Sequence, residues 1–154
     1  MKKGFSVEGL IIFLLPMVIN IFYVIFPPKQ TKEPISLKMP VLEAIEQGTR
    51  IAYVMAICIL VSNSKVDYTS VSLYISIIFL VLYHIVWIRY YMGGRDVKLL
   101  GTKFLGVPMP LAVFPVLYFI FASIWLHNYI ATGVMVVFGI VHNIISYRNF
   151  YINE

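Results

Sequence analysis

Residues 107–147 read VPMPLAVFPVLYFIFASIWLHNYIATGVMVVFGIVHNIISY, and this segment decides the class of fold. It consists of two apolar runs without a single Asp, Glu, Lys or Arg. Each run is close to the roughly 20 residues that a helix needs to cross a bilayer. The link between the runs is only His127-Asn128. We therefore expect two transmembrane helices, over residues 107–126 and 129–147, that form a tight antiparallel hairpin.

Three further apolar runs have a similar length, and they predict transmembrane helices over residues 7–26, 41–62 and 70–90. The 154-residue chain is 60% hydrophobic and only 12% charged, whereas soluble domains average about 25% charged residues. The sequence thus predicts an all-α, polytopic integral membrane protein, built as one compact bundle of five transmembrane helices. The first run is long and ends in Pro27-Pro28 without a small-x-small cleavage site, so we expect a retained helix rather than a signal peptide.

The basic residues predict the orientation of this bundle, because Lys and Arg are enriched in short cytoplasmic loops. With five spans, the loops after the first and third helices lie on the same side as the C-terminus. Eight basic residues belong to that side: Lys29, Lys32, Lys38, Arg89, Arg95, Lys98, Lys103 and Arg148. Three belong to the other side: Lys2, Lys3 and Lys65. We expect the N-terminus outside and the C-terminus in the cytoplasm.

Several classes of protein are excluded by the composition and by missing motifs. The net charge of +5 comes from basic residues in short loops, not from a basic helix face or an aromatic platform of the kind that binds nucleic acid. Single Cys58 leaves no intrachain disulfide. Zinc-protease, nucleophile-elbow, Walker and dinucleotide motifs are absent. We predict no nucleic-acid partner, no metal site and no catalytic residue, and we favour a protein that is not an enzyme.

Polar side chains of four expected helices fall at one depth. At about 1.5 Å per helical residue, they lie roughly 6–12 Å below the cytoplasmic surface of the hydrocarbon. They are Asn20, Glu46, Arg50, His84 and His142. Ionisable groups at such depth are costly, so we expect them to face one another or water rather than lipid.

The helix expected over residues 41–62 has two distinct faces. Ala44, Gly48, Ala52 and Ala56 form a ridge of small residues, at which a neighbouring helix can approach closely. Glu46 and Arg50 fall on the opposite face, four residues apart, which is the spacing at which opposite charges meet on a helix. The pair can neutralise itself so that the helix inserts, or it can bind a ligand. We expect Arg50, the deeper charge, to be the most sensitive position.

The simplest assembly is a polar, aromatic-lined pocket inside the bundle that opens toward the cytoplasm. The leading hypothesis is that this pocket binds a polar or amphipathic small molecule, and transport of that molecule is a further option. Pockets of this kind are mostly apolar with a few convergent polar groups. The expected ligand-binding residues are Glu46, Arg50, Tyr53, Tyr83, His84, Trp87, His142 and Asn143.

Two alternatives stay open. The polar layer can be packing glue in a non-catalytic accessory subunit of a larger membrane complex. Alternatively, His84 and His142 can ligate one haem from both faces, since haem iron commonly takes histidine. Otherwise no cofactor is expected. The expected partners are the lipid bilayer, a small molecule, and a second copy or a larger membrane protein. In a prokaryote the location is the plasma membrane.

Overall fold

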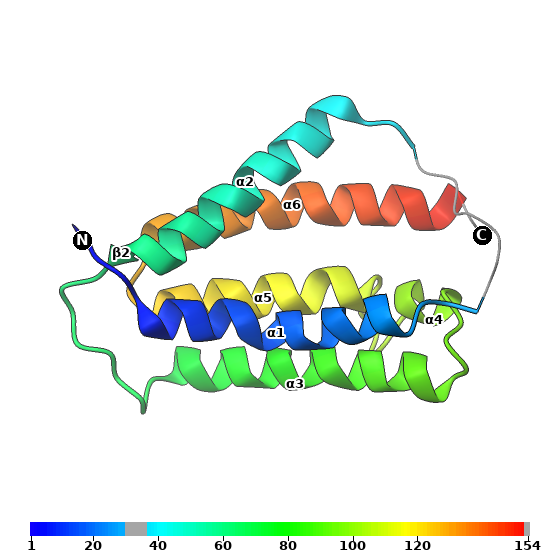
Figure 1. Cartoon of the computed structure of the whole chain (residues 1–154), viewed down its shortest axis with the longest axis horizontal. Helices are drawn as coiled ribbons and strands as arrows, with labels where there is room; N and C mark the ends of the chain where they lie inside the picture. The colour runs from blue at the N-terminus through cyan, green and yellow to red at the C-terminus, as the bar shows by residue number, and fades with distance from the viewer. Residues whose placement is uncertain (30–36, 153–154) are drawn as a thin grey trace.

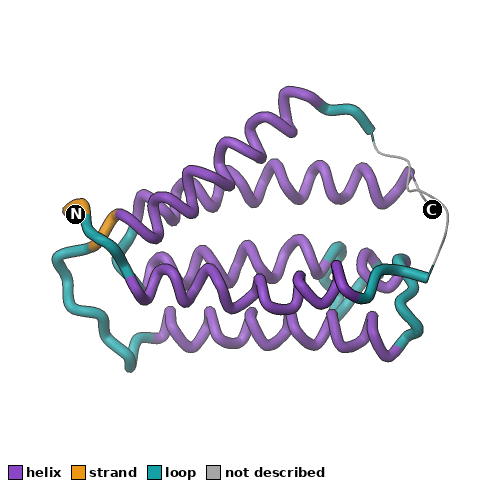
Figure 2. Tube along the Cα trace, viewed as in Figure 1, coloured by secondary structure: helices purple, strands orange, loops and turns teal. Residues whose placement is uncertain are grey.

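The computed structural model of the chain describes residues 1–29 and 37–152. Over these residues the fold is all-helical, as predicted, apart from two strands of two residues each. The helices are α1 (Val7–Ile25), α2 (Pro40–Ile59), α3 (Val71–Met92), α4 (Lys98–Gly101), α5 (Pro110–Trp125) and α6 (Tyr129–Ile152), and the strands are β1 (Lys2–Lys3) and β2 (Leu60–Val61). Figure 2 shows the five long helices and the short strand pair beside the N-terminus.

Three of the helices are long and apolar enough to cross a membrane: Val7–Ile25, Val71–Met92 and Tyr129–Phe150. α5 is apolar but has only 16 residues. It starts later than residue 107 because Met109, between two prolines, has a left-handed backbone with φ of 51°. α2 has the length, but it carries Glu43, Glu46 and Arg50. The described chain therefore has the helices of a membrane protein.

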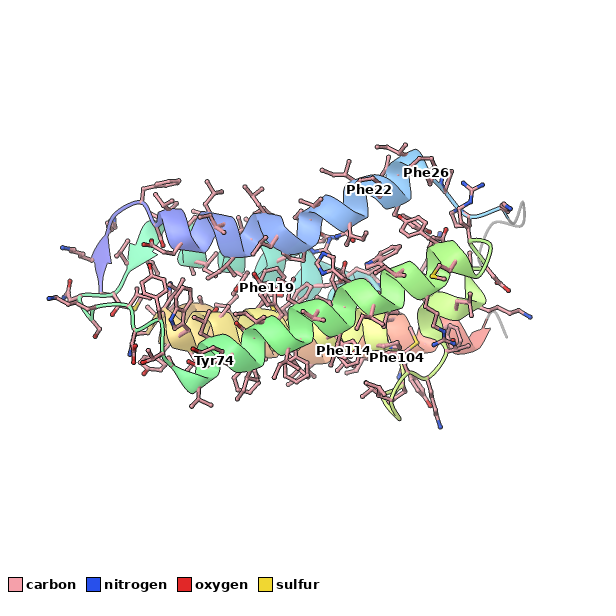
Figure 3. All side chains as sticks on the ribbon, turned by 90° about the horizontal axis from the view of Figure 1, so that it is seen from below. Phe22, Phe26, Tyr74, Phe104, Phe114 and Phe119 are labelled. Carbon is pink, nitrogen blue, oxygen red and sulfur yellow. The ribbon has the colours of Figure 1, made fainter. Side chains whose placement is uncertain are left out.

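α1, α3, α5 and α6 run nearly parallel to one long axis, whereas α2 is inclined to it (Figure 1). α5 is central and packs against α3 on one side and α6 on the other, while α2 packs along α6 and α1 contacts α2, α3 and α5. Figure 3 shows the result for single rings. Phe114 and Phe119 lie between helices, at 2% and 8% exposure, whereas Phe22 and Phe26 project outward from the α1 side at 46% and 48%. The exposed apolar surface of α1 suits contact with lipid.

The two chain ends lie at opposite ends of the bundle (Figure 1). The N-terminus lies beside the C-terminal end of α2, because β1 pairs antiparallel with β2, which directly follows α2. Lys2 lies opposite Val61 and Lys3 opposite Leu60. The basic residues expected on the cytoplasmic side gather toward the C-terminal end, except that Lys32 lies outside the described residues. The predicted orientation depends on these basic residues lying at one end of the bundle.

The end that holds the N-terminus is fixed by hydrogen bonds between segments. Asn128 is 1% exposed, and its amide donates to the carbonyls of Ala56 and Leu60 at 2.8 and 2.9 Å. The Trp125 indole donates to the backbone carbonyl of Asp67 at 2.8 Å. The pKa of the Asp67 carboxyl lies below its ordinary value, because the hydroxyl and the amide of Thr69 both donate to it. The loop after α2 is thereby held against the turn of the α5–α6 hairpin.

A proline inside α1 is compensated by a tyrosine of α5. Pro16 has no N–H, so the carbonyl of Ile12 loses its helical partner. The hydroxyl of Tyr118 donates to this carbonyl at 2.9 Å, and Tyr118 is only 3% exposed. In an apolar environment an unpaired carbonyl is costly. This hydrogen bond therefore ties α1 to the central helix.

We expect Tyr118→Phe to lower the free energy of unfolding by about 1–3 kcal/mol, because it leaves the buried Ile12 carbonyl without a donor. The matched control is Tyr74→Phe on the exposed face of α3, where Tyr74 is 54% exposed. That change should stay within about 0.5 kcal/mol. Unfolding by denaturing detergent, followed by circular dichroism, measures both. Equal small losses in the two variants would contradict the role given to Tyr118.

Candidate intramembrane binding site

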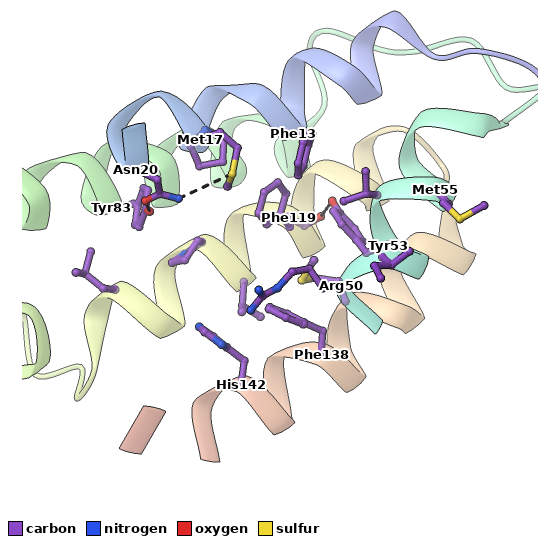
Figure 4. A pocket seen from close by; sticks show the side chains of 17 residues that line it. Phe13, Met17, Asn20, Arg50, Tyr53, Met55, Tyr83, Phe119, Phe138 and His142 are labelled. Carbon is purple, nitrogen blue, oxygen red and sulfur yellow. Dashed lines mark hydrogen bonds between the residues drawn. The ribbon is translucent and has the colours of Figure 1, made fainter. Parts of the chain in front are cut away.

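A cavity of about 570 Å³ lies among α1, α2, α3, α5 and α6. Its wall is mostly apolar. The polar side chains that reach it are Asn20 from α1, Arg50 from α2, Tyr83 from α3 and His142 from α6. Figure 4 shows Arg50 and His142 on either side of Phe138, and Asn20 beside Tyr83. The apolar wall is formed by Phe13, Pro16, Met17, Ile51, Val54, Met55, Leu111, Pro115, Val116, Phe119, Met135 and Phe138, together with the ring of Tyr53.

The cavity opens on the side of α2. Ile51 and Met55 belong to its wall, yet they are 61% and 56% exposed. Along each of α1, α2 and α6, the polar residue of the wall lies nearer the C-terminal end of the bundle than the apolar ones, for example His142 compared with Met135. The space is thus polar at one end and apolar over the rest, with an opening onto the outer surface.

Glu46 connects two of the polar side chains. Its Oε1 accepts a hydrogen bond from Nη2 of Arg50 at 2.7 Å and one from Nδ1 of His142 at 2.8 Å. The predicted pairing of Glu46 with Arg50 is therefore present, and α6 adds a third member. The Glu46 side chain is 9% exposed, compared with 48% for Arg50 and 25% for His142. The position of Arg50 along the helix suggested that it would be the more buried of the two. The structure shows instead that Glu46 is the buried member of the pair.

An aromatic ring contacts both Arg50 and His142. The His142 ring stacks on Phe138, one helical turn earlier, with centroids 5.0 Å apart and an interplanar angle of 13°. The guanidinium carbon of Arg50 lies 5.6 Å from the centroid of the same ring. A cation over an aromatic face is favourable, more so where water is scarce. Phe138 therefore holds Arg50 and His142 at the cavity wall while Glu46 holds them from behind.

A second polar contact joins α1 to α3 across the cavity. The Tyr83 hydroxyl donates to Oδ1 of Asn20 at 2.7 Å. The hydroxyl of Tyr53 bonds elsewhere, to Ser123 Oγ at 3.1 Å and to the Phe119 carbonyl at 3.3 Å, so only its ring serves the wall. Pro115 removes the helical partner of the Leu111 carbonyl, and both residues line the cavity.

Four of the eight residues expected to bind ligand line the cavity, namely Arg50, Tyr53, Tyr83 and His142, and Glu46 lies directly behind two of them. The other three lie elsewhere. Asn143 follows His142 by one residue, which turns it to a separate groove, and its amide donates to the Gly139 carbonyl at 2.7 Å. His84 bonds the Leu80 carbonyl of its own helix at 2.7 Å.

Trp87 is a core residue rather than part of the cavity wall. It is 6% exposed and lies against Tyr23 and Tyr90, with centroids 5.3 and 5.6 Å apart. His84 and His142 do not share the cavity, because only His142 lines it. Haem binding between the two histidines stays a prediction.

The ridge of small residues on α2 does not pack against a helix of this chain at its first three members. Ala44, Gly48 and Ala52 are exposed, whereas Ala56 is buried. A methyl group added to Gly48 would meet no atom within 4 Å. The expected packing through this ridge is therefore wrong for a single chain, since α2 uses its polar face to contact α6.

Asn20 and the apolar wall, apart from the ring of Tyr53, were not among the residues predicted for the site. Asn20 belonged to the polar layer, and its depth could have placed it at the site. Phe138 lies one turn before His142, a spacing that could have been noticed. Met17, Phe119 and Met135 lie in uniformly apolar helices and give no such signal.

Comparison of the chain with protein-family models, with curated proteins and with solved structures finds no match. The chemistry of the cavity is therefore the basis for its function. Its volume falls within the range of about 300–1,000 Å³ that is typical of small-molecule sites. Within residues 1–29 and 37–152, no three His, Cys, Asp or Glu side chains form a group that could hold a metal ion. The arrangement suits binding of an organic molecule with a polar end and an apolar body.

Proposed function

We propose that the protein is a five-span membrane protein that binds an amphipathic small molecule in this cavity. The observation that carries the proposal is the polarity of the cavity, with Asn20, Arg50, Tyr83 and His142 toward one end and apolar side chains over the rest. The polar group of the ligand would lie among these four side chains. Its apolar body would contact the rings and thioethers of Phe13, Phe119 and Met135.

The proposed topology has all five long helices crossing the bilayer, with the N-terminus outside and the C-terminus in the cytoplasm. The polar end of the cavity then lies on the cytoplasmic side. The opening beside Ile51 and Met55, both exposed residues of α2, would face lipid. An amphipathic molecule that partitions into the cytoplasmic leaflet could enter through it with its polar end already at the correct depth.

Filling the cavity should displace the ligand. Val54 lines the cavity from α2, and we expect Val54→Trp to reduce the amount of bound amphipathic molecule at least tenfold, about 1.4 kcal/mol of binding free energy. The control is Ile78→Trp on α3, where Ile78 is 56% exposed and not part of the cavity wall. Native mass spectrometry of protein released from mild detergent measures occupancy by molecules retained from the membrane. Equal occupancy in both variants would contradict the proposal.

A second candidate function is association through α2. Its exposed ridge of Ala44, Gly48 and Ala52 has the small-residue spacing at which membrane helices approach closely. This face would then contact a second copy or a larger membrane partner. Stoichiometric co-purification of a second chain from the native membrane would favour this function, and a purely monomeric protein would count against it.

A further inference from the structure

The ionisable side chains at the polar end are arranged with Arg50 and His142 in front and the Glu46 carboxylate behind. Arg50 and His142 line the cavity, whereas Glu46 does not. One oxygen of Glu46 already accepts hydrogen bonds from both of them, at 2.7 and 2.8 Å. A ligand in the cavity therefore meets the donors of the cluster first. This order favours an anionic polar group and disfavours a cationic one.

The charge of this cluster depends on one proton. With neutral His142, the charges of Arg50 and Glu46 cancel, and with protonated His142 the cluster carries one positive charge. The hydrogen bond to the Glu46 carboxylate uses the proton on Nδ1 of His142, which leaves Nε2 as an acceptor in the neutral ring. Nε2 becomes a donor only when a second proton is bound. An anion at His142 thus requires the protonated ring.

Within residues 1–29 and 37–152, the other elements around the cavity add no competing charge to its wall. α1 contributes Asn20, and α5 contributes only apolar side chains to the wall. The remaining titratable groups of the wall are the phenols of Tyr53 and Tyr83, which are neutral at physiological pH. Proton uptake on anion binding would therefore occur at His142.

We infer that the ligand carries an anionic headgroup, such as a carboxylate, phosphate or sulfonate, which binds at Arg50 and His142 together with one proton on Nε2 of His142. The inference rests on the proposed function and names its ligand class. The shared chemistry is a small oxyanion, and its source is an amphipathic molecule rather than a free ion, because the rest of the cavity wall is apolar.

The test compares three probes: 1-hexadecanesulfonate, whose headgroup does not titrate in this range, 1-hexadecanol, which is its neutral analogue, and methanesulfonate, which is the free anion. We expect the purified full-length chain in mild detergent to bind hexadecanesulfonate at least tenfold more tightly than either other probe. Binding should weaken about tenfold from about pH 6 to about pH 8. Titration calorimetry at about pH 8, where an ordinary histidine ring is neutral, in two buffers of different ionisation heat should give about one proton taken up per anion.

Matched variants separate the two residues. His142→Gln should bind hexadecanesulfonate with no dependence on pH, and Arg50→Gln should bind it at least about tenfold more weakly at both pH values. The controls His84→Gln and Arg89→Gln, at residues outside the cavity wall, should behave like the unchanged protein. The proton count on the unchanged protein requires no variant, so a variant that fails to fold does not decide the result.

Each of the other outcomes overturns a specific part of the inference. Binding of hexadecanesulfonate without proton uptake, or pH dependence that survives His142→Gln, overturns the role of His142. Preference for hexadecanol overturns the anionic headgroup while leaving the proposed function in place. Equal binding of methanesulfonate overturns the amphipathic source. Failure of all three probes to bind overturns the proposed function itself.

Discussion

Replacing Glu46 with glutamine should lower the free energy of unfolding by about 1.5–3 kcal/mol, the range for a hydrogen bond to a charged group whose partner is buried. The Glu46 side chain is 9% exposed, and one of its oxygens accepts from both Arg50 and His142. Glutamine keeps the size but not the charge, so Arg50 loses its counter-ion. Unfolding by denaturing detergent measures the loss.

The control for this change is Glu43→Gln, one turn earlier on the same helix. Glu43 is exposed and accepts a hydrogen bond from the backbone amide of Met39 at 3.0 Å. Its replacement should lower the free energy of unfolding by about 1 kcal/mol or less. Arg50→Gln should fall between the two, because Arg50 is half exposed and Glu46 keeps His142 as a partner. A loss at Glu46 no larger than that at Glu43 would contradict the buried cluster.

The double variant Glu46→Gln, Arg50→Gln measures the coupling within this cluster. We expect it to lose less stability than the sum of the single changes, by about 0.5–3 kcal/mol. Once Glu46 is neutral, removing Arg50 leaves no charge unpaired. Losses that add within about 0.3–0.5 kcal/mol would mean that the two side chains do not interact.

Helix positions could be predicted because a bilayer-length apolar run is a strong and local signal. α1 and α6 begin at the residues expected from the sequence, Val7 and Tyr129. The ends were less certain, and α6 continues to Ile152 instead of ending at Tyr147. The short helix α4 and the pairing of β1 with β2 left no signal, since each has four residues or fewer.

The depth of the site residues along the helices could be predicted, but the side of each helix on which they lie could be predicted only in part. Rise per residue places Asn20, Arg50 and His142 at one level, and the structure brings all three to one cavity. Direction around a helix requires one face to differ from the others. α2 has such a polar face, so Glu46 and Arg50 could be paired. α3 is apolar nearly all round, and the side on which His84 lies could not be read from it.

The link from Glu46 to His142 depends on which helices are neighbours. It joins residues 96 positions apart, and no local spacing indicates that α2 packs along α6. The small-residue ridge of α2 suggested that a neighbouring helix would pack against the ridge itself. The polar side contacts α6 instead, where Glu46 accepts a hydrogen bond from His142 at 2.8 Å.

Gly9→Ala should lower the free energy of unfolding by about 3 kcal/mol, at the upper end of the usual penalty for overpacking. A methyl group at Gly9 would overlap the backbone carbonyl oxygen of Ile57, and a backbone atom cannot turn aside as a side chain can. α1 would have to move away from α2 at the end where Gly4 and Ser6 donate to the carbonyls of Ile59 and Cys58 at 2.9 and 2.8 Å.

The matched control is Gly48→Ala on α2, where the added methyl group meets no atom within 4 Å. Alanine is favoured over glycine in a helix by about 1 kcal/mol, so this variant should be equally or more stable than the unchanged protein. Because Phe13, Met17 and Asn20 of α1 line the cavity, Gly9→Ala should also weaken binding of hexadecanesulfonate, whereas Gly48→Ala should not. Thermal unfolding in detergent and the same titration measure both effects. Full stability of Gly9→Ala would contradict the close contact of α1 with α2, and a loss in Gly48→Ala would place a second chain on the ridge.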